Sequence, residues 1–202
     1  MRLIDILEEK KYNTDKWTDH HYVQEIYEPL FAKYREENVN FCEVGVWNGE
    51  SMKLWSDYFV NANNIVGVDI FTRTEMSEVE KNLDGYDVKL HKFNSHKDID
   101  KFNKFSKKYS DGFDIVIDDG SHWYENQINT YKNFSKIMNK GGVYIIEDIS
   151  FIPESIKTMY KIGGESLEPY QVSKIQYEIP NIKFYSTGGE MFSNQPIGVV
   201  RF

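Results

Sequence analysis

Two clusters of polar side chains, each placed directly after an apolar stretch, are the residues of this sequence best suited to chemistry. Phe113–Ile117 is largely apolar and leads into Asp118–His122, which holds two carboxylates, a glycine, a hydroxyl and an imidazole. Gly142–Ile146 is also largely apolar and leads into Glu147 and Asp148. Apolar runs rich in β-branched residues are typical of central strands in a parallel sheet. Because ligands bind at the carboxyl ends of such strands, we expect both clusters to form one acidic site.

The carboxylates of Asp119, Glu147 and Asp148 converge if the two strands are neighbours. Like charges at short range repel one another, so this site needs either protonation or a bound cation. Ligation by oxygen alone favours a hard divalent cation such as Mg²⁺ over Zn²⁺. A divalent cation makes a nearby hydroxyl more acidic, and the imidazole of His122 is suited to accept its proton near neutral pH. Capping of helices by these polar residues is the alternative interpretation.

A glycine-containing turn and a later aspartate are typical of a pocket for a nucleoside. The apolar stretch 40–46 leads into a turn with Gly45 and Gly49, and glycine permits close approach of a ligand to the backbone. The spacing is not the Gly-x-Gly-x-x-Gly pattern of pyrophosphate binding. Asp69 lies at the end of the next strand, 65–70, where an acid accepts hydrogen bonds from ribose hydroxyls. A helix cap is the alternative role for this residue.

Alternation of apolar patterns predicts an α/β protein. We expect strands over 40–46, 65–70, 86–93, 113–117, 142–146, 182–186 and 197–202. We expect helices over 1–12, 17–34, 51–59, 75–84, 98–108, 125–138 and 153–167. The packed face of the second helix carries Tyr22, Ile26, Tyr27, Leu30 and Phe31, and Gly141–Gly142 is expected to end the sixth. The segment 172–179 alternates, so a further strand is an open alternative there. This order predicts a doubly wound, mostly parallel seven-stranded sheet with an antiparallel C-terminal edge and helices on both faces.

Composition points to one globular domain. The chain has 202 residues, of which 40% are hydrophobic and 28% charged, with a formal net charge of −8. An acidic chain without a basic block is a poor candidate for nucleic-acid or anionic-membrane binding. The single Cys42 forms no intrachain disulfide, and no apolar run approaches the ~20 residues of a membrane helix. We therefore expect a cytoplasmic protein with N-terminal helices over 1–38 and a sheet-containing core over 39–202.

These residues together resemble the class I S-adenosylmethionine-dependent methyltransferases, and among them the metal-dependent sugar O-methyltransferases of the macrocin type. The Asp-Asp-Gly-Ser-His block followed by Glu-Asp is the specific part of the pattern, whereas the glycine turn is shared by the whole superfamily. Four stretches carry the resemblance: Thr14–Lys16 with His20 and Tyr22, Glu43–Gly45 with Gly49 and Ser51, Asp118–His122, and Glu147–Asp148.

The resemblance implies a Rossmann-like methyltransferase domain over 1–202, with the N-terminal helices as a lid, and a role for each matching residue. The residues implied for S-adenosylmethionine are Glu43, Gly45, Gly49, Ser51, Asp69, Asn94, Ser95 and Asp118, with Asp69 at the ribose and Asn94 and Ser95 near the adenine. Asp119, Glu147 and Asp148 are implied as Mg²⁺ ligands and His122 as the general base. The lid or substrate wall is implied to contain Thr14, Asp15, Lys16, His20 and Tyr22.

The implied reaction is transfer of a methyl group from S-adenosylmethionine to a sugar hydroxyl, assisted by Mg²⁺. The sequence after Glu147 and Asp148 continues Ile149-Ser150-Phe151, without the histidine or other polar residues expected from relatives. A simple sugar is therefore expected as acceptor in preference to a macrolide glycoside. Homo-oligomers are expected because relatives assemble into them.

Three alternatives have to be weighed against this interpretation. A hydroxylase-like relative would need redox iron, and a facial triad uses two histidines, whereas only His122 belongs to the acidic constellation. A nicotinamide dehydrogenase would need the pyrophosphate glycine pattern, which is absent. A non-catalytic S-adenosylmethionine-binding module would be marked by loss of the base or the ligands, and both are present.

Overall fold

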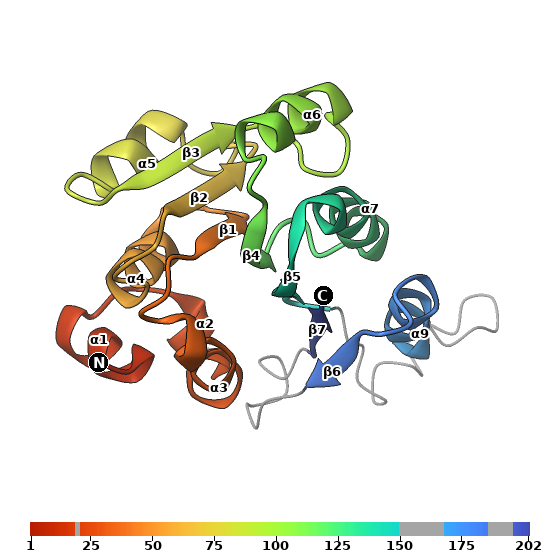
Figure 1. Cartoon of the computed structure of the whole chain (residues 1–202), viewed down its shortest axis with the longest axis horizontal. Coiled ribbons are helices and arrows are strands. Elements are labelled where there is room, and N and C mark those ends of the chain that lie inside the picture. The colour runs from red at the N-terminus through yellow and green to blue at the C-terminus, as the bar shows by residue number, and fades with distance from the viewer. Residues whose placement is uncertain (19–20, 150–167, 186–195) are drawn as a thin grey trace.

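A seven-stranded sheet runs through the middle of the molecule in the order β3-β2-β1-β4-β5-β7-β6 (Figure 1). The computed structural model describes residues 1–18, 21–149, 168–185 and 196–202. The strands are β1 (Asn40–Val44), β2 (Asn64–Asp69), β3 (Val88–Lys92), β4 (Phe113–Asp118), β5 (Met138–Ile146), β6 (Lys183–Tyr185) and β7 (Ile197–Arg201). The first five strands pair in parallel, and β7 pairs antiparallel with both β5 and β6. The predicted sheet with an antiparallel C-terminal edge is confirmed.

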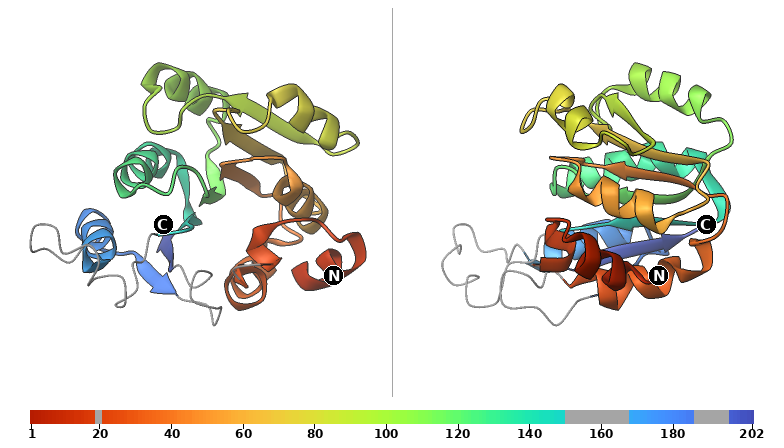
Figure 2. Two further views of the ribbon diagram at one scale, coloured as in Figure 1. Left: turned by 180° about the vertical axis from the view of Figure 1, so that it is seen from behind. Right: turned by 90° about the vertical axis from the view of Figure 1, so that its left-hand side faces the viewer.

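Helices cover both faces of the sheet, which explains why its central strands are apolar on both sides. One face packs against α1 (Leu3–Lys10), η1 (Val23–Tyr27), α3 (Glu28–Phe31), α4 (Glu50–Tyr58) and α5 (Met76–Asn82). The other face packs against α6 (Ile99–Lys108), α7 (Tyr124–Phe134) and α9 (Glu168–Glu178). Figure 2 shows the N-terminal elements on the same side of the sheet as α4. None of the described helices is long and apolar enough to cross a bilayer.

The helix expected over 17–34 is divided into shorter pieces. After α2 (Asp15–Thr18) the chain forms the π-helical turn η1, then α3 and the 3₁₀ turn η2 (Ala32–Tyr34). Pro29 lies in the first turn of α3 and has no N–H to donate, and the helical backbone continues into it from η1, where the N–H of Glu28 bonds to the carbonyl of Val23. The extra residue of the π turn lets Tyr22 and Tyr27 lie edge to face, with ring centroids 6.2 Å apart.

One expectation in the C-terminal half is wrong, and one open alternative is decided. Helix α7 ends at Phe134 and is followed by the 3₁₀ turn η3 (Ser135–Ile137), and β5 already begins at Met138. Gly141 and Gly142 therefore lie in this strand, where the pairing with β4 shifts register. Most of the segment 172–179, left open as a strand, belongs to α9, which ends at Glu178 and buries the face that carries Ile175. The helix expected over 153–167 lies outside the described residues.

The strand order reverses beside β1, which pairs with β2 on one side and β4 on the other. In sheets of this kind a crevice opens at the carboxyl ends of the strands where the order reverses. The two acidic clusters follow β4 and β5, which are neighbours as expected. The fold therefore brings both clusters to the edge of the sheet where a ligand site is expected.

Candidate active site

Neighbouring strand ends bring a group of carboxylates together. Glu43 lies within β1, Asp119 follows β4 directly, and Glu147 and Asp148 follow β5. The backbone N–H of Asp119 donates to the carbonyl of Val44, 2.8 Å away, which locks the end of β4 against β1. The parallel pairing of β1, β4 and β5 thus places acids from three strands side by side.

A lysine from the N-terminal segment lies at the centre of these acids. Lys16, in α2, has a side chain that is 1% exposed. Its Nζ contacts Oδ2 of Asp119 and lies 2.9 Å from Oε2 of Glu147 and 3.4 Å from Oε1 of Glu43. We call Lys16, Glu43, Asp119 and Glu147 the inner group. Its single ammonium is the counter-charge that the carboxylates need when buried together.

Glu147 is held on all sides by protein groups. The hydroxyl of Tyr27 donates to Oε1, and Nζ of Lys16 donates to Oε2. The amide of Gln127 donates to the backbone carbonyl, 2.9 Å away. The carboxylate is therefore oriented by two N-terminal side chains and not only by its own strand.

The imidazole of His122 lies between two other carboxylate oxygens. Its Nε2 is 3.3 Å from Oδ1 of Asp119, and its Nδ1 is 3.6 Å from Oδ2 of Asp148. The hydroxyl of Tyr22 donates to Oδ1 of Asp148 at 2.9 Å. We call Asp119, His122 and Asp148 the outer group. His122 and Asp148 both have left-handed backbones, with φ of 56° and 50°, a strain that is common at functional sites.

Burial and charge shift the pKa values of these groups in opposite directions. Burial raises the pKa of both Glu43 and Glu147. Burial also opposes ionisation of Asp119, but the ammonium of Lys16 and the hydrogen bond to His122 bring its pKa below the ordinary value. The same hydrogen bond raises the pKa of His122 against the effect of its own burial. Negative charge is thus concentrated on Asp119, next to the imidazole.

Asp118 supports the turn after β4. It is 2% exposed, and it accepts hydrogen bonds from the backbone N–H of Gly120 at 3.3 Å and the hydroxyl of Tyr144 at 3.2 Å. Burial raises the pKa of Asp118 to about 7. Asp118 is not one of the described residues that line the neighbouring pocket, so its implied contact with a cofactor stays a prediction.

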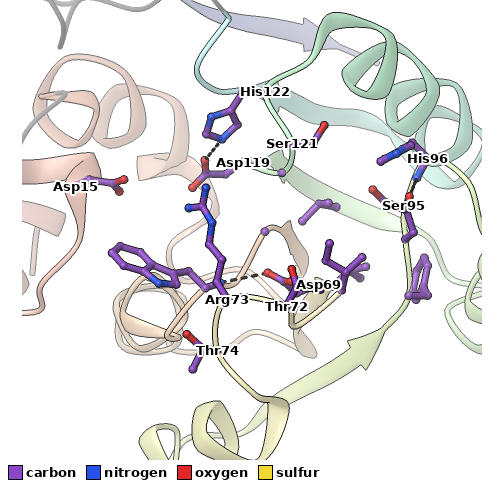
Figure 3. A pocket seen from close by; sticks show the side chains of 18 residues that line it. Asp15, Asp69, Thr72, Arg73, Thr74, Ser95, His96, Asp119, Ser121 and His122 are labelled. Atoms are coloured by element: carbon purple, nitrogen blue, oxygen red, sulfur yellow. Dashed lines mark hydrogen bonds and ion pairs between the residues drawn. The ribbon is translucent and has the colours of Figure 1, made fainter.

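A pocket of about 320 Å³ opens beside the outer group (Figure 3). Its wall is built by residues at the ends of β1, β2, β3 and β4. Figure 3 shows His122 and Asp119 at one end, Ser95 at the opposite end and Asp69 between them. A concave site of this size with a few converging polar groups is suited to a small organic ligand.

Asp69 connects the turns after β1 and β2. Its Oδ2 accepts the backbone N–H groups of Val46 at 2.7 Å and Trp47 at 3.2 Å, and its Oδ1 accepts that of Phe71 at 2.6 Å. The backbones of Trp47 and Phe71 are left-handed, with φ of 46° and 52°. The carboxylate lines the pocket, so it lies where the predicted contact with a ribose would be made.

The other residues implied for the cofactor divide into those in the pocket wall and those behind it. Gly45, Asn94 and Ser95 line the pocket together with Asp69. Asn94 also accepts backbone N–H groups in its own turn, and the hydroxyl of Ser95 shares a hydrogen bond of 3.0 Å with that of Thr130. Outside the described wall of the pocket lie Glu43, Gly49 and Ser51. The hydroxyl of Ser51 donates to Glu43 at 2.6 Å, and Gly49 caps α4.

The residues implied for a lid are distributed more widely than expected. Asp15 lines the pocket, whereas Lys16 and Tyr22 reach the carboxylates of the inner and outer groups. Thr14 is buried, and its carbonyl accepts a hydrogen bond from the hydroxyl of Thr18 at 3.2 Å. His20 lies outside the described residues.

Two residues of the site escaped the sequence analysis. Tyr27 was assigned only to a packed face, although a buried tyrosine usually needs a partner for its hydroxyl. Arg73 follows β2 without any motif, and Figure 3 shows its guanidinium pointing toward the end of the pocket that holds Asp119.

Within the described part of the chain, two groups of side chains have ligand atoms close enough to hold a metal ion. The potential ligand atoms of Glu43, Asp119 and Glu147 lie within 4.8 Å of one another, and so do those of Asp119, His122 and Asp148. The first set already surrounds the ammonium of Lys16. The second set offers carboxylate oxygens beside the pocket, a donor chemistry that fits a hard divalent cation. The expected triad of Asp119, Glu147 and Asp148 is thus divided between the inner and outer groups, and its ligand role stays a prediction.

The glycine turn, Asp69 and both acidic clusters all lie between the start of β1 and Asp148, just after β5. The sequence profile of a family described as a methyltransferase domain matches this same stretch, residues 42–149, more than half of the chain. The chain belongs to this methyltransferase domain family.

Similar proteins include sugar O-methyltransferases. The chain is 30% identical to 8-demethyl-8-(2-methoxy-α-L-rhamnosyl)-tetracenomycin-C 3'-O-methyltransferase of Streptomyces olivaceus, over 69% of this chain and 35% of that enzyme. It is 24% identical to the uncharacterized protein R132 of Acanthamoeba polyphaga mimivirus, over 85% of this chain and 80% of that protein. The chain thus spans about a third of the length of the sugar-modifying relatives that it matches.

The fold of the methyltransferase domain is also found in solved structures. The chain superposes on the MycE methyltransferase from the mycinamycin biosynthetic pathway, solved with Mg, S-adenosylhomocysteine and mycinamycin VI. The TM-score is 0.69 at 23% identity, covering 100% of this chain and 54% of MycE. This likeness supports the Rossmann-like fold of the chain.

Proposed function

We propose that this protein is an S-adenosylmethionine-dependent, Mg²⁺-assisted O-methyltransferase that acts on a hydroxyl of a sugar or glycoside. The observation that carries the proposal is the position of His122, between the carboxylates of Asp119 and Asp148, at one end of a pocket that Asp69 lines. A proton acceptor beside a candidate cation site is the arrangement that activation of a hydroxyl requires. The methyltransferase family of the chain and the names of its relatives support the same reaction.

In this proposal the pocket binds S-adenosylmethionine. Gly45 allows the backbone to approach the ligand, Asp69 accepts hydrogen bonds from the ribose, and Asn94 and Ser95 lie near the adenine. Asp69 can do this only through oxygen lone pairs that its three backbone donors leave available. Glu43, Gly49, Ser51 and Asp118 then act by supporting the turns.

The acidic residues would hold the cation. Asp119 and Asp148 are the proposed Mg²⁺ ligands at the outer group, and Glu147 is the third acid implied by the family pattern. Bound there, the cation supplies a positive charge that makes an acceptor hydroxyl more acidic.

The side chains of this protein contribute proton transfer and alignment. His122 takes the proton of the acceptor hydroxyl on a ring nitrogen, while the hydroxyl oxygen forms a bond to the methyl carbon and the bond from that carbon to the sulfonium sulfur breaks. The pair of electrons stays on sulfur, so the products are a methyl ether and S-adenosylhomocysteine. Holding both substrates in line within one pocket supplies much of the rate enhancement.

The acceptor is proposed from the relatives and from one feature of the site. Relatives of the chain are named for methylation of rhamnosyl, mycinamicin and olivosyl hydroxyls. Ile149, directly after Asp148, is fully buried and gives no polar contact to a large aglycone. A simple sugar is therefore the proposed acceptor. Self-association and a cytoplasmic location are proposed on the resemblance alone.

The first test is calorimetric titration of S-adenosylmethionine into the full chain, with Mg²⁺ and with chelator. We expect binding to the unaltered protein and weaker binding to Asp69→Ala, with the exposed Asp111→Ala as the matched control. Methyl transfer to a panel of free and nucleotide-linked sugars is then followed by mass spectrometry. Failure of the folded protein to bind would contradict the proposal. Binding without transfer to any sugar would favour the non-catalytic module.

A further inference from the structure

The two ends of the pocket have different tasks in the proposed reaction. Ser95 lies at one end, where the adenine is proposed to bind, and Asp69 follows at the place of the ribose (Figure 3). The rest of S-adenosylmethionine then extends toward the other end, which Asp119 and His122 line. This is the end to which the methyl group has to be brought. The amino-acid group beyond the sulfur therefore needs its own contacts there.

That amino-acid group is a zwitterion, so its site has to offer both signs of charge. A charged group that loses its hydration without a partner is costly, and this holds for the carboxylate and for the ammonium. Arg73 is the only lysine or arginine among the described residues that line the pocket. Figure 3 shows its guanidinium pointing toward the end that holds Asp119. A planar guanidinium is suited to bind a carboxylate through two parallel hydrogen bonds.

The opposite charge comes from Asp15, in a different part of the chain. Asp15 is the first residue of α2 and lines the same pocket, and Figure 3 shows its carboxylate on the side of Asp119. None of the ion pairs within the described residues involves Asp15 or Arg73. The carboxylate of Asp119 is a proposed ligand of the cation, which leaves that of Asp15 for an ammonium.

We propose that Arg73 and Asp15 bind the amino-acid group of S-adenosylmethionine, with the guanidinium of Arg73 on its carboxylate and the carboxylate of Asp15 on its ammonium. The proposal rests on the proposed function in assigning the pocket to this cofactor. It gives α2 and the loop after β2 a joint task, because two charged contacts from different segments fix the tail while the methyl group faces His122.

The experiment compares ligands that differ only in this tail, by calorimetric titration into the full chain. S-Adenosylhomocysteine carries both charged groups, its aminopropyl analogue lacks the carboxylate, and its carboxypropyl analogue lacks the ammonium. Methylthioadenosine lacks the whole tail. For the unaltered protein, removal of either charged group should weaken binding by about tenfold, the lower end of what a hydrogen bond between charged groups contributes. An aminopropyl analogue that binds as tightly as S-adenosylhomocysteine would exclude the contact with Arg73, whether or not any variant folds.

The two variants should lose affinity for different ligands. Arg73→Met should bind S-adenosylhomocysteine and the carboxypropyl analogue about tenfold more weakly, and the aminopropyl analogue as the unaltered protein does. Asp15→Asn should instead lose affinity for S-adenosylhomocysteine and the aminopropyl analogue. Arg201→Met and Asp111→Asn are the matched controls, because both residues are exposed and lie outside the described wall of the pocket. Methylthioadenosine should bind equally to all variants, since its contacts are unchanged.

The outcomes separate this proposal from the proposed function. If the folded, unaltered protein binds none of these ligands, the assignment of the pocket to the cofactor is wrong. If S-adenosylhomocysteine binds but the variants lose affinity for all ligands alike or for none, the roles of Arg73 and Asp15 are wrong and the cofactor site stands. If each variant loses affinity for its own analogue but no sugar is methylated, the roles stand and the proposed reaction is wrong.

Discussion

His122 is held in the site by a backbone that a histidine seldom adopts. Its φ of 56° belongs to the left-handed region, which costs roughly 1–2 kcal/mol for a residue with a Cβ. This backbone places the ring with Nε2 facing Asp119 and Nδ1 facing Asp148. Strain of this kind persists where the surrounding structure determines the conformation, as the turn after β4 does here.

We predict that His122→Asn lowers turnover. Asparagine tolerates the left-handed backbone but accepts no proton, so kcat should fall by about 10²–10⁴-fold while S-adenosylmethionine binding is unchanged. Steady-state kinetics and calorimetry measure the two quantities. The control is His21→Asn, at an exposed histidine whose φ of 55° is nearly the same. Turnover of His122→Asn close to that of the control would remove His122 from the role of base.

The element that completes the site is the N-terminal segment, not a strand. It delivers Lys16 from α2, Tyr22 from the residue before η1 and Tyr27 from η1 to acids that follow β4 and β5. The π turn matters here, because its extra residue lets tyrosines five positions apart address the adjacent acids Glu147 and Asp148. The segment is thus part of the site's structure as well as a cover over the sheet.

Tyr27→Phe tests this delivery. The substitution leaves a buried carboxylate oxygen of Glu147 without its donor, so the free energy of unfolding should fall by about 1–3 kcal/mol. Tyr34→Phe is the control, since its hydroxyl donates to the carbonyl of Gly141 at 2.7 Å in an exposed place. That change should cost about 1 kcal/mol or less. Urea unfolding curves compare the two, and equal losses would argue against a tight contact at Glu147.

The turn after β1 has no space for a side chain at Gly45. Gly45 and Gly85 have similar left-handed backbones, with φ of 92° and 86°. A Cβ added to Gly45 would lie 1.9 Å from the carbonyl oxygen of Asp119, whereas a Cβ added to Gly85 would meet no other atom within 4 Å. Gly85→Ala should therefore cost about 1–2 kcal/mol for backbone conformation alone. Gly45→Ala should cost at least about 3 kcal/mol and weaken ligand binding, because β1 and β4 must separate. Denaturant unfolding measures both, and similar losses would contradict the close approach.

The two layers of helices packed on the sheet bury side chains far from the site, and burial disfavours the charged form of a titratable group. His91 joins β3 to α6, with its ring edge to face with Phe105 and its Nε2 2.8 Å from the hydroxyl of Tyr109. Burial, assisted by Lys108, lowers the pKa of His91 to about 4. The folded protein therefore keeps this imidazole neutral where the unfolded chain would protonate it.

The sign of the resulting pH dependence follows from that difference. The contribution of neutral His91 is fully present above the unfolded pKa of about 6.5 and is lost as the pH falls from there toward 4. Between pH 7 and pH 4.5, His91→Gln should lose about 1 kcal/mol less stability than the unaltered protein, a figure reduced because the ring is only partly buried. Urea unfolding at both pH values measures this, with the exposed His21→Gln as control. Parallel pH profiles of His91→Gln and the unaltered protein would exclude the effect.

The sequence by itself determined the order of strands and helices along the chain and the residues that lie at the strand ends. Apolar runs that break into polar residues are a local pattern, so Asp69, Asp119, Glu147 and Asp148 could be located from their neighbours alone. The antiparallel C-terminal edge followed from two late strands without a helix between them. The helix expected over 125–138 ends earlier, at Phe134, and the strand left open at 172–179 is replaced by α9, because short apolar segments suit either a helix or a strand.

Only the tertiary structure decided how the acids are shared. Lys16 and Asp119 are separated by 103 residues, and Tyr27 and Glu147 by 120. No periodicity connects positions so far apart, and a lysine in a polar turn is ordinarily a solvated residue. The division into inner and outer groups arises because the N-terminal segment packs on the sheet and buries that lysine among carboxylates, where charge compensation selects its partners.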